Sequence, residues 1–508
     1  MQAANKVIFN TIVTYSRAVI TIFITLYSTR VIIEELGVKD FGLYSLVGGI
    51  VAMLAFFNSA LTASTQRFVS VNLGKGLLNE VKTVIANSIV IHITIGVLIV
   101  FFVELIGGYF IQNKLIIPLD RISTAMIVFH FVVASTFITI ISVPAEAILN
   151  AHENMLFLAI LRLLEVFLNL GAAILLTYIN NFDKLKVYAF LLFIILLLIN
   201  LIKWGYCYYK YQETKISLSK DFSKSQIKEQ SSFAGWNLFG AACGMGRGQG
   251  ISIISNMFFG PVVNAAYGIA DQVKVQSNFF SSTILRVMNP QIMKSEGADD
   301  RERMLRLSMM ACKFGFFMLA FFAVPLIFEM SQVLEFWLGD IPPYVVNFSV
   351  LILIGSMIEQ LTVGLKSAVQ SVGQIKKYMV VVGGIILLNL PLTYILLYSG
   401  HKAESALIVF VFLEIIAGIV RLFYTVKLTG LKILIFLDNV VVKVIPPVLC
   451  SLLTCIIIVE TLEFEYRFLL TILFSSISFI ISAYFFSLTE EEKKIILKLY
   501  KKLLNRFT

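Results

Sequence analysis

The chain has 508 residues, of which 58% are hydrophobic and only 14% are charged, and its formal net charge is +10. A soluble domain carries roughly 25% charged residues, so the composition excludes a soluble protein and, with it, a nucleic-acid-binding reading of the positive charge. The five cysteines and four histidines show no metal-ligand or disulfide spacing, so we expect no metal site.

The apolar segments predict an all-α polytopic membrane protein. A spanning helix needs roughly 20 mostly apolar residues. We expect about 14 transmembrane helices, and twelve is the alternative count because segments 233–259 and 262–285 are polar. The expected spans are 7–33, 41–63, 84–110, 123–143, 157–179, 187–208, 233–259, 262–285, 307–328, 345–365, 379–398, 403–423, 440–459 and 468–486.

The loop charges predict the orientation. With the N-terminus in the cytoplasm, the cytoplasmic loops carry about four times as many Lys and Arg as the opposite loops, as the positive-inside rule requires. An even number of spans also places the C-terminus in the cytoplasm. We therefore expect both termini to be cytoplasmic.

Two pairs of similar segments predict an internal repeat. The first pair is 37–44 (GVKDFGLY) and 260–267 (GPVVNAAY), and the second is 147–154 (AILNAHEN) and 367–374 (SAVQSVGQ). The members of the two pairs are separated by nearly the same length of chain. This spacing predicts two six-helix lobes in parallel repeat around a central cavity, followed by two C-terminal helices.

This repeat suggests five parts. They are an N-terminal lobe 1–208, a cytoplasmic linker 209–232, a C-terminal lobe 233–426, two additional helices 427–487, and a tail 488–508. In the tail, Thr489 and Glu492 fit a capping box, and the residues beyond them predict a basic amphipathic helix on the anionic cytoplasmic leaflet.

The first span carries one polar stripe. Asn10, Thr14, Arg17 and Thr21 recur at helical spacing among apolar residues. Because a charge facing lipid is costly, such a stripe is typical of a helix that lines a water-filled cavity. The alternative is a packing stripe whose hydroxyl groups bond to neighbouring helices.

Three further spans carry charges. Asp271, Lys274 and Asn278 share one face of the eighth span, and Arg162 and Glu165 repeat the arrangement in the fifth. The alternative in both cases is local neutralisation at i, i+3 spacing. The seventh span places Arg247 in a glycine-rich run, which favours a bendable helix beside the cavity.

The cavity candidates are mainly cationic. Arg17, Arg247, Lys274 and Arg162 would favour an anionic ligand, since guanidinium groups match phosphate oxygens. The chain has no Walker A loop, so energy would come from Na⁺ or H⁺ or from the substrate gradient. Asp271, Glu165 and Glu359 are the candidates for ion coupling, and no other cofactor is expected.

The segment 30–44, together with Gln66-Arg67-Phe68 and 260–267, resembles the polysaccharide biosynthesis membrane proteins. These are the Wzx-type flippases of the multidrug/oligosaccharidyl-lipid/polysaccharide (MOP) superfamily. The resemblance implies a bacterial inner-membrane protein that moves undecaprenyl-pyrophosphate-linked oligosaccharide, such as an O-antigen or capsule unit, to the periplasmic leaflet. It also implies membrane lipids and other polysaccharide-assembly proteins as partners.

Two other functions compete with this one. A multidrug exporter of the same superfamily would use Na⁺ or H⁺ antiport, but its cavity should be acidic and aromatic. A membrane-embedded glycosyltransferase or polymerase would need an acidic catalytic residue in a sizeable outer loop. The best such segment, 340–344, looks like a turn, so we do not expect an enzyme.

Overall fold

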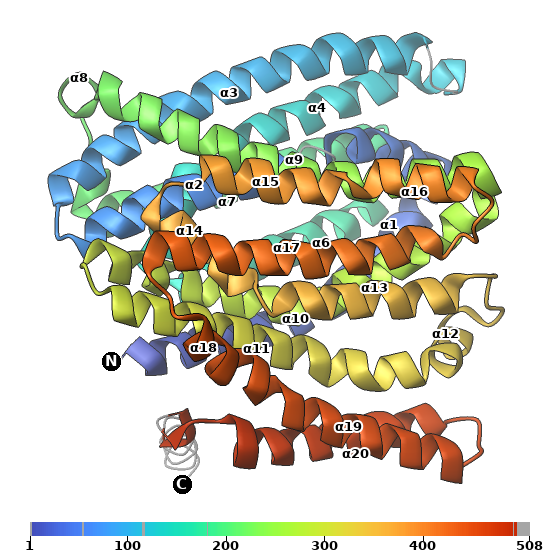
Figure 1. Ribbon diagram of the computed structural model, residues 1–508. Helices are drawn as coiled ribbons and strands as arrows, with labels where there is room; N and C mark the ends of the chain where they lie inside the picture. The colour runs from blue at the N-terminus through green and yellow to red at the C-terminus, as the bar shows by residue number, and fades with distance from the viewer. Residues whose placement is uncertain (1–2, 53–54, 114–116, 180, 491, 495–508) are drawn as a thin grey trace, which may run out of the picture. The chain divides into compact units, whose positions relative to one another are not determined.

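The computed structural model describes residues 3–52, 55–113, 117–179, 181–490 and 492–494, and every regular element within them is helical (Figure 1). The chain forms two compact units, each described here by itself. The first unit is Asn10–Ala241, and the second comprises the described residues from Ala242 onward with the first turns of α1. The boundary falls inside α9 (Lys224–Phe259), so one continuous helix contributes to both units.

The first unit is a bundle of long helices. In it α3 packs against α2 and α4, and α7 packs against α4, α5 and α6. Phe129 lies fully buried in the core between α3, α4 and α7. Its elements are α1 (Ala3–Ala52), α2 (Ala55–Gly74), α3 (Leu78–Asn113), η1 (Leu119–Arg121), α4 (Ile122–Ile141), α5 (Val143–Ala151), α6 (Met155–Leu175), η2 (Leu176–Tyr178), α7 (Lys184–Lys210), η3 (Gln212–Thr214), α8 (Leu218–Asp221) and the first half of α9.

The second unit is a larger helical bundle. Its core lies where α10, α13 and α17 meet, around Phe348 and Phe410. Its elements are the second half of α9, α10 (Pro261–Gly297), α11 (Arg301–Phe328), α12 (Met330–Leu338), α13 (Val345–Gln360), α14 (Val363–Val372), α15 (Lys376–Leu387), α16 (Asn389–Tyr398), α17 (Ser405–Thr429), α18 (Ile433–Phe436), η4 (Leu437–Val441), α19 (Val442–Thr461), α20 (Arg467–Ser482) and η5 (Ala483–Ser487).

The backbone repeats between the two units. Gly37 interrupts α1 with φ 75° and ψ 162°, and its repeat-related residue Gly260 precedes α10 with φ 75° and ψ −166°. Gly76 and Asp299 are separated by the same length of chain as Gly37 and Gly260, and both have positive φ. The two units therefore share unusual backbone conformations at these matched positions, as the predicted repeat requires.

The second predicted segment pair behaves in the same way. Glu153 and Gly373, which occupy matching positions in that pair, both have positive φ. The helices before them are broken alike, with α4 and α5 separated at Ser142 and α13 and α14 separated at Leu361 and Thr362. The separation is slightly smaller here than between Gly37 and Gly260, so the second unit is a little shorter between these landmarks.

Ten helices of the described chain are long and apolar enough to cross a membrane. They correspond to ten of the expected spans, and the predicted total of 14 is not confirmed by them. The other four expected spans, 7–33, 41–63, 233–259 and 262–285, lie in α1, α2, α9 and α10, apart from positions 53–54, which are outside the described residues. The chain is a multi-pass membrane protein.

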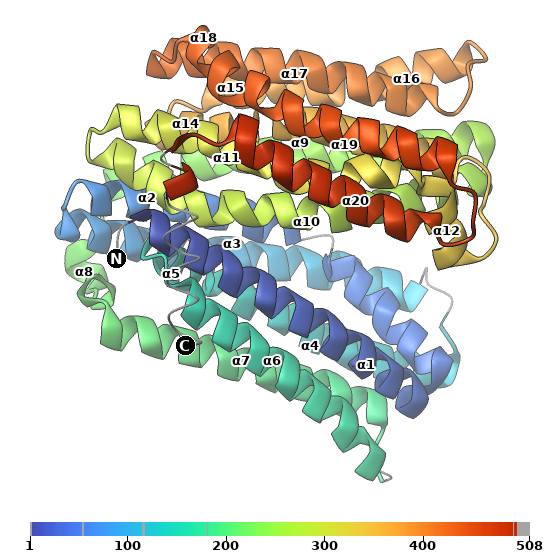
Figure 2. The ribbon, with the colours of Figure 1, turned by 90° about the horizontal axis from the view of Figure 1, so that it is seen from below.

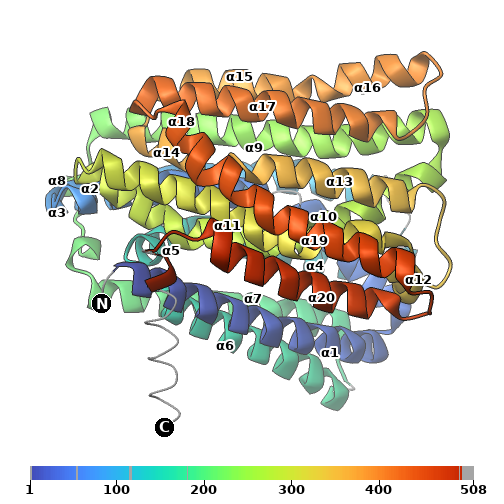
Figure 3. The ribbon, with the colours of Figure 1, turned by 60° about the horizontal axis from the view of Figure 1, so that its bottom comes forward.

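The last two long helices are fastened to α11 and to its junction with α12. They run side by side in Figures 2 and 3, and α19 packs on α11. At one end Arg467 binds both oxygens of buried Glu329 at 2.9 and 3.0 Å, and Thr471 donates to the same carboxylate. At the other end Lys313 binds Glu492 at 2.7 Å.

The start of the tail matches the sequence prediction. The backbone N–H of Thr489 donates to Glu492 Oε2 at 2.8 Å, and the Glu492 N–H donates to Thr489 Oγ1 at 3.3 Å. These reciprocal bonds form the predicted capping box. The amphipathic helix predicted beyond it falls mostly on residues 495–508, outside the described residues.

Candidate functional site

The polar stripe of α1 is partly buried within the first unit. Asn10 is 3% exposed, and its Nδ2 donates to the backbone oxygen of Glu153 at 3.1 Å. Thr14 is also buried and donates to the backbone oxygen of Asn10. Arg17 and Thr21 are half-buried. Asn10 therefore bonds to a distant segment of the chain, whereas the Thr14 hydrogen bond stays within α1.

The charges of α6 form a local pair. Arg162 Nη1 binds Glu165 Oε2 at 2.8 Å, and the Arg162 side chain is 57% exposed. This is the i, i+3 arrangement that the sequence left open. An exposed pair of this kind contributes at most about 1 kcal/mol to stability.

The second unit contains a buried ion-pair network centred on Glu414 of α17. The Glu414 side chain is 0% exposed, and its Oε1 accepts a hydrogen bond from Arg247 of α9 at 2.5 Å. Its Oε2 accepts from Arg421, two turns further along α17, at 3.2 Å. Arg421 also donates to Thr362, in the break between α13 and α14, at 3.3 Å. Glu414 therefore joins α9 to α17, and Arg421 extends the network to the break between α13 and α14.

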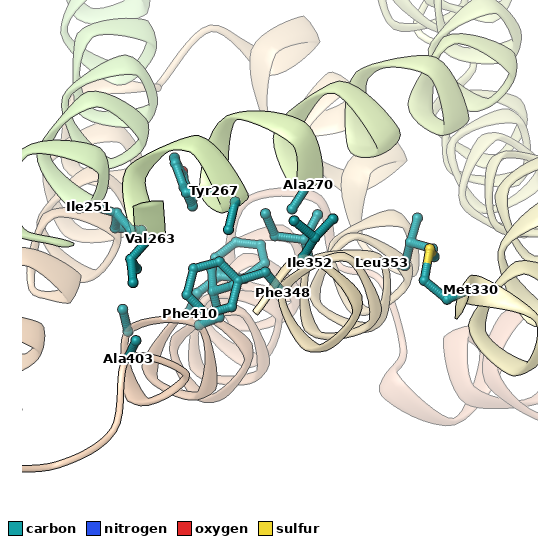
Figure 4. Close-up of a cluster of buried hydrophobic side chains, with 14 of the residues drawn as sticks. Ile251, Val263, Tyr267, Ala270, Met330, Phe348, Ile352, Leu353, Ala403 and Phe410 are labelled. Atoms are coloured by element: carbon teal, nitrogen blue, oxygen red, sulfur yellow. The ribbon is translucent and has the colours of Figure 1, made fainter. Parts of the chain in front are cut away.

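Aromatic rings complete this network. The Arg247 guanidinium lies 4.6 Å from the centroid of the Phe410 ring, and Lys274 Nζ of α10 lies 5.4 Å from the same centroid. Figure 4 shows Phe410 between the helices, near Phe348 and beneath the helix that carries Tyr267. A cation over an aromatic face is stabilised by the ring quadrupole, so Phe410 supports two cations at once.

Lys274 does not use the partner that the sequence offered. Asp271 and Lys274 are both half-buried, and these two described side chains form no ion pair with each other. Glu359 of α13 instead interacts electrostatically with Arg421, Lys274 and Arg247. The structure thus gathers four candidates from the sequence, Arg247, Lys274, Asp271 and Glu359, in the second unit. Asn278 lies two turns beyond Asp271 on α10, half-buried and with an unpartnered Oδ1.

Two cations of the network were missed by sequence reasoning. Arg421 follows Glu414 by two helical turns on one face, so this spacing was a usable signal. Lys366 lies just beyond the expected span 345–365, whereas helical structure continues through α14. Its side chain is exposed, although it interacts electrostatically with Arg421 and Glu359.

Arg247, Glu414 and Arg421 have no charged counterpart at the repeat-related positions, whereas Lys366 corresponds to Glu146 in the alignment that pairs Glu153 with Gly373. Arg247 corresponds to Ile24, in the alignment that pairs Gly37 with Gly260. Glu414 and Arg421 correspond to Phe193 and Asn200, in the alignment that pairs the starts of α7 and α17. These three charges are therefore a specialisation of one unit and not a requirement of the fold.

The glycines of α9 have different surroundings. A Cβ at Gly250 would overlap the methyl carbons of Leu390, so the Leu390 side chain of α16 would have to shift to accept a larger residue there. A Cβ at Gly244 would meet nothing within 4 Å. Packing therefore explains Gly250 but not Gly244, and α9 is helical through both.

No group of three or more metal-binding side chains occurs among the described residues. The carboxylates of the network are instead surrounded by guanidinium and ammonium groups.

In sequence, neither a protein-family model nor a curated protein matches the chain. In structure, it is similar to a mutant form of MATE, with 13% identity over 84% of this chain and 96% of that chain and a TM-score of 0.71. It is also similar to an outward-facing multidrug resistance MATE family transporter of the MOP superfamily, with 13% identity over 85% and 96% and a TM-score of 0.70.

A third similar structure is a MOP superfamily transporter from Pyrococcus furiosus, with 12% identity over 84% of this chain and 95% of that chain and a TM-score of 0.70. That transporter is described as having a binding pocket of reverse polarity that suggests a different function. These likenesses show that the chain has a MATE-like transporter fold.

Proposed function

We propose that the protein is a flippase that moves an anionic lipid-linked oligosaccharide across the bacterial inner membrane by alternating access. The expected substrate is an undecaprenyl-pyrophosphate-linked unit, such as an O-antigen or capsule repeat. The observation that carries the proposal is the charged network of the second unit. It contains four cations, Arg247, Lys274, Lys366 and Arg421, and three carboxylates, Asp271, Glu359 and Glu414.

The excess of positive charge favours an anionic ligand. An unpaired charge in a low-dielectric interior is costly, and a bound anion offsets that cost. A pyrophosphate group would meet ammonium and guanidinium donors without displacing the Arg247–Glu414 pair, because Lys274 and Lys366 form no ion pair within the described chain. The polyprenyl tail would remain in the lipid while the sugars cross in water.

The network also bears on energy coupling. Both oxygens of Glu414 are occupied by arginines, so this carboxylate is a poor site for Na⁺ or H⁺. Glu359 and Asp271 are then the better coupling candidates, and Glu165 is weaker because it pairs with Arg162. Arg17 remains a proposed binding residue contributed by the first unit.

Transport by purified protein tests the proposal. Full-length protein in liposomes should move a fluorescent undecaprenyl-pyrophosphate-linked oligosaccharide between leaflets. Lys274→Gln should slow this movement at least about tenfold, as expected for loss of one charge-assisted contact of about 1.5–3 kcal/mol. Arg162→Gln is the control because its side chain is exposed and locally paired, and it should retain wild-type transport. No movement by the wild type, or an equal loss in both variants, would contradict the proposal.

The alternative function is a multidrug exporter with Na⁺ or H⁺ antiport. It is favoured by the similar structure described as a multidrug resistance transporter. The same liposomes loaded with an organic cation such as ethidium distinguish the two functions. Ion-gradient-driven ethidium movement without lipid movement would support the exporter.

A further inference from the structure

A small cavity with polar groups in its wall lies inside the first unit, and none of the residues that line it belongs to the ion-pair network. Its volume is about 10 Å³, and it lies between α2, α3 and the first half of α9. The polar residues of its wall are Ser64 and Thr65 of α2, Ser88 and His92 of α3, and Gln230 of α9, and each of these is at least nine-tenths buried. Leu61, Phe68 and Ile91 also line the cavity, so its few polar groups converge on a small space within an apolar bundle.

The hydrogen bonds of His92 define the form of its ring. Nδ1 lies 2.5 Å from the backbone oxygen of Ser88. A carbonyl oxygen can only accept, so Nδ1 carries the hydrogen. His92 is 2% exposed among neutral groups, which disfavours the charged imidazolium. Nε2 is therefore a bare acceptor, and it has no partner among the described residues.

The side-chain amide of Gln230 has a hydrogen-bond donor without a partner, which complements the acceptor on His92. Its Oε1 accepts from Ser88 Oγ at 3.4 Å, while its Nε2 has no partner among the described residues. An unsatisfied buried polar group costs about 1–3 kcal/mol, and here two such groups line one cavity. Filling both positions with a single ligand removes both costs.

We propose that this cavity binds one water molecule, which bridges His92 and Gln230. A single water needs roughly 10–15 Å³, which the cavity supplies. Water can donate to Nε2 and accept from the Gln230 amide, and it remains suitable if the amide rotates. A metal cation would find no carboxylate in this wall, and an organic ligand would be too large.

The water fastens the first half of α9 to α3. Other contacts also hold the start of α9 to its neighbours. Gln226 donates to Glu80 of α3 at 2.6 Å, and Ser223, just before α9, exchanges two hydrogen bonds with Asn87 of α3. Arg67 of α2 lies over the rings of Phe68 and Phe233. Helix α9 continues to Arg247 in the second unit. The water site thus holds one end of the helix whose other end carries the Arg247–Glu414 pair.

Histidine nitrogen spectroscopy tests the site directly. Full-length protein in lipid nanodiscs is labelled with ¹⁵N at its four histidines, and the His92 signals are those lost in His92→Gln. The expected result is a protonated Nδ1, a bare Nε2, and magnetisation transfer from water to the ring. A protonated Nε2, or no transfer from water, overturns the proposal. A change in these signals when Na⁺ is replaced by choline would identify a cation as the occupant and would also overturn it.

Hydrogen exchange tests the fastening of α9. Gln230→Met keeps the side-chain length but removes the amide, so amides within 224–241 should exchange about tenfold faster than in the wild type. His130→Gln is the control, because His130 is an exposed residue of α4 that pairs with Glu104. It should leave these amides unchanged. If Gln230→Met does not fold, Ser88→Ala replaces it, and unchanged exchange in the variant that folds overturns the proposed role.

Discussion

Glu414 Oε1 accepts a hydrogen bond from Arg247, a residue 167 positions earlier in the chain, at the point where α9 meets α17. The same carboxylate receives Arg421 on its other oxygen. One fully buried anion thus holds two cations in place inside the second unit. Removing the Glu414 charge would leave both arginines without their partner.

Glu414→Gln should destabilise the protein strongly. Breaking a buried ion pair by removing one partner costs about 3–5 kcal/mol because the remaining charge is uncompensated, and here two arginines lose their partner. Thermal unfolding of the protein in detergent measures the effect. Glu34→Gln is the matched control, since the Arg30–Glu34 pair is exposed to solvent and should contribute little to stability. Equal loss in the two variants would contradict this account.

Gly260→Ala should also destabilise. The backbone at Gly260 has φ 75° and ψ −166°, a region essentially restricted to glycine, and a side chain there costs about 1–3 kcal/mol. Gly37→Ala should behave alike because its conformation is nearly the same. Gly171→Ala, near the C-terminal end of α6 and with open space around the added Cβ, should be neutral or stabilising. In chemical denaturation, the midpoints of Gly260→Ala and Gly37→Ala should fall below that of the wild type, and the midpoint of Gly171→Ala should not.

Gly250→Ala should weaken the packing of α9 on α16. The new Cβ would overlap the methyl carbons of Leu390, and forcing extra volume into a packed contact costs about 1–3 kcal/mol. Gly244→Ala, on the same helix but with nothing within 4 Å, should gain stability through helix propensity. Opposite shifts in the thermal midpoint are expected, and a loss of stability in both would show that α9 needs glycine for flexibility instead.

Asp183 should contribute to the acid sensitivity of the protein. This residue caps α7 outside the membrane-spanning segment and binds Arg121, which also binds Asp40. Burial by itself raises the pKa of Asp183, but the Thr124 hydrogen bond and the Arg121 charge outweigh it, so the pKa lies below its ordinary value.

The direction of the pH effect follows from this lowered pKa. Asp183 stabilises the fold above the unfolded-state pKa of about 3.9, and this stabilisation is lost as pH falls through the lower folded-state pKa. Asp183→Asn should therefore lower the thermal midpoint at pH 7 and flatten its decline between about pH 4 and 2. An unchanged decline in the variant would contradict the assignment.

Several features could be predicted from the sequence because they depend on local chemistry. Runs of apolar residues require helices where lipid is the solvent, since every backbone group must bond within its own segment. Gly37 and Gly260 were recognisable as a repeat because the same backbone conformation demands the same residue type. The capping box of Thr489 and Glu492 spans one turn and needs no tertiary partner.

The tertiary structure alone decided which charges are paired. Arg247 was expected to face a cavity, and the fold gave it Glu414 from a helix far away in sequence. Asp271 and Lys274 were neighbours in sequence but did not pair, because Lys274 lies over Phe410 instead. Ion pairing depends on which helices touch and how they are rotated, and helical periodicity by itself does not contain that information.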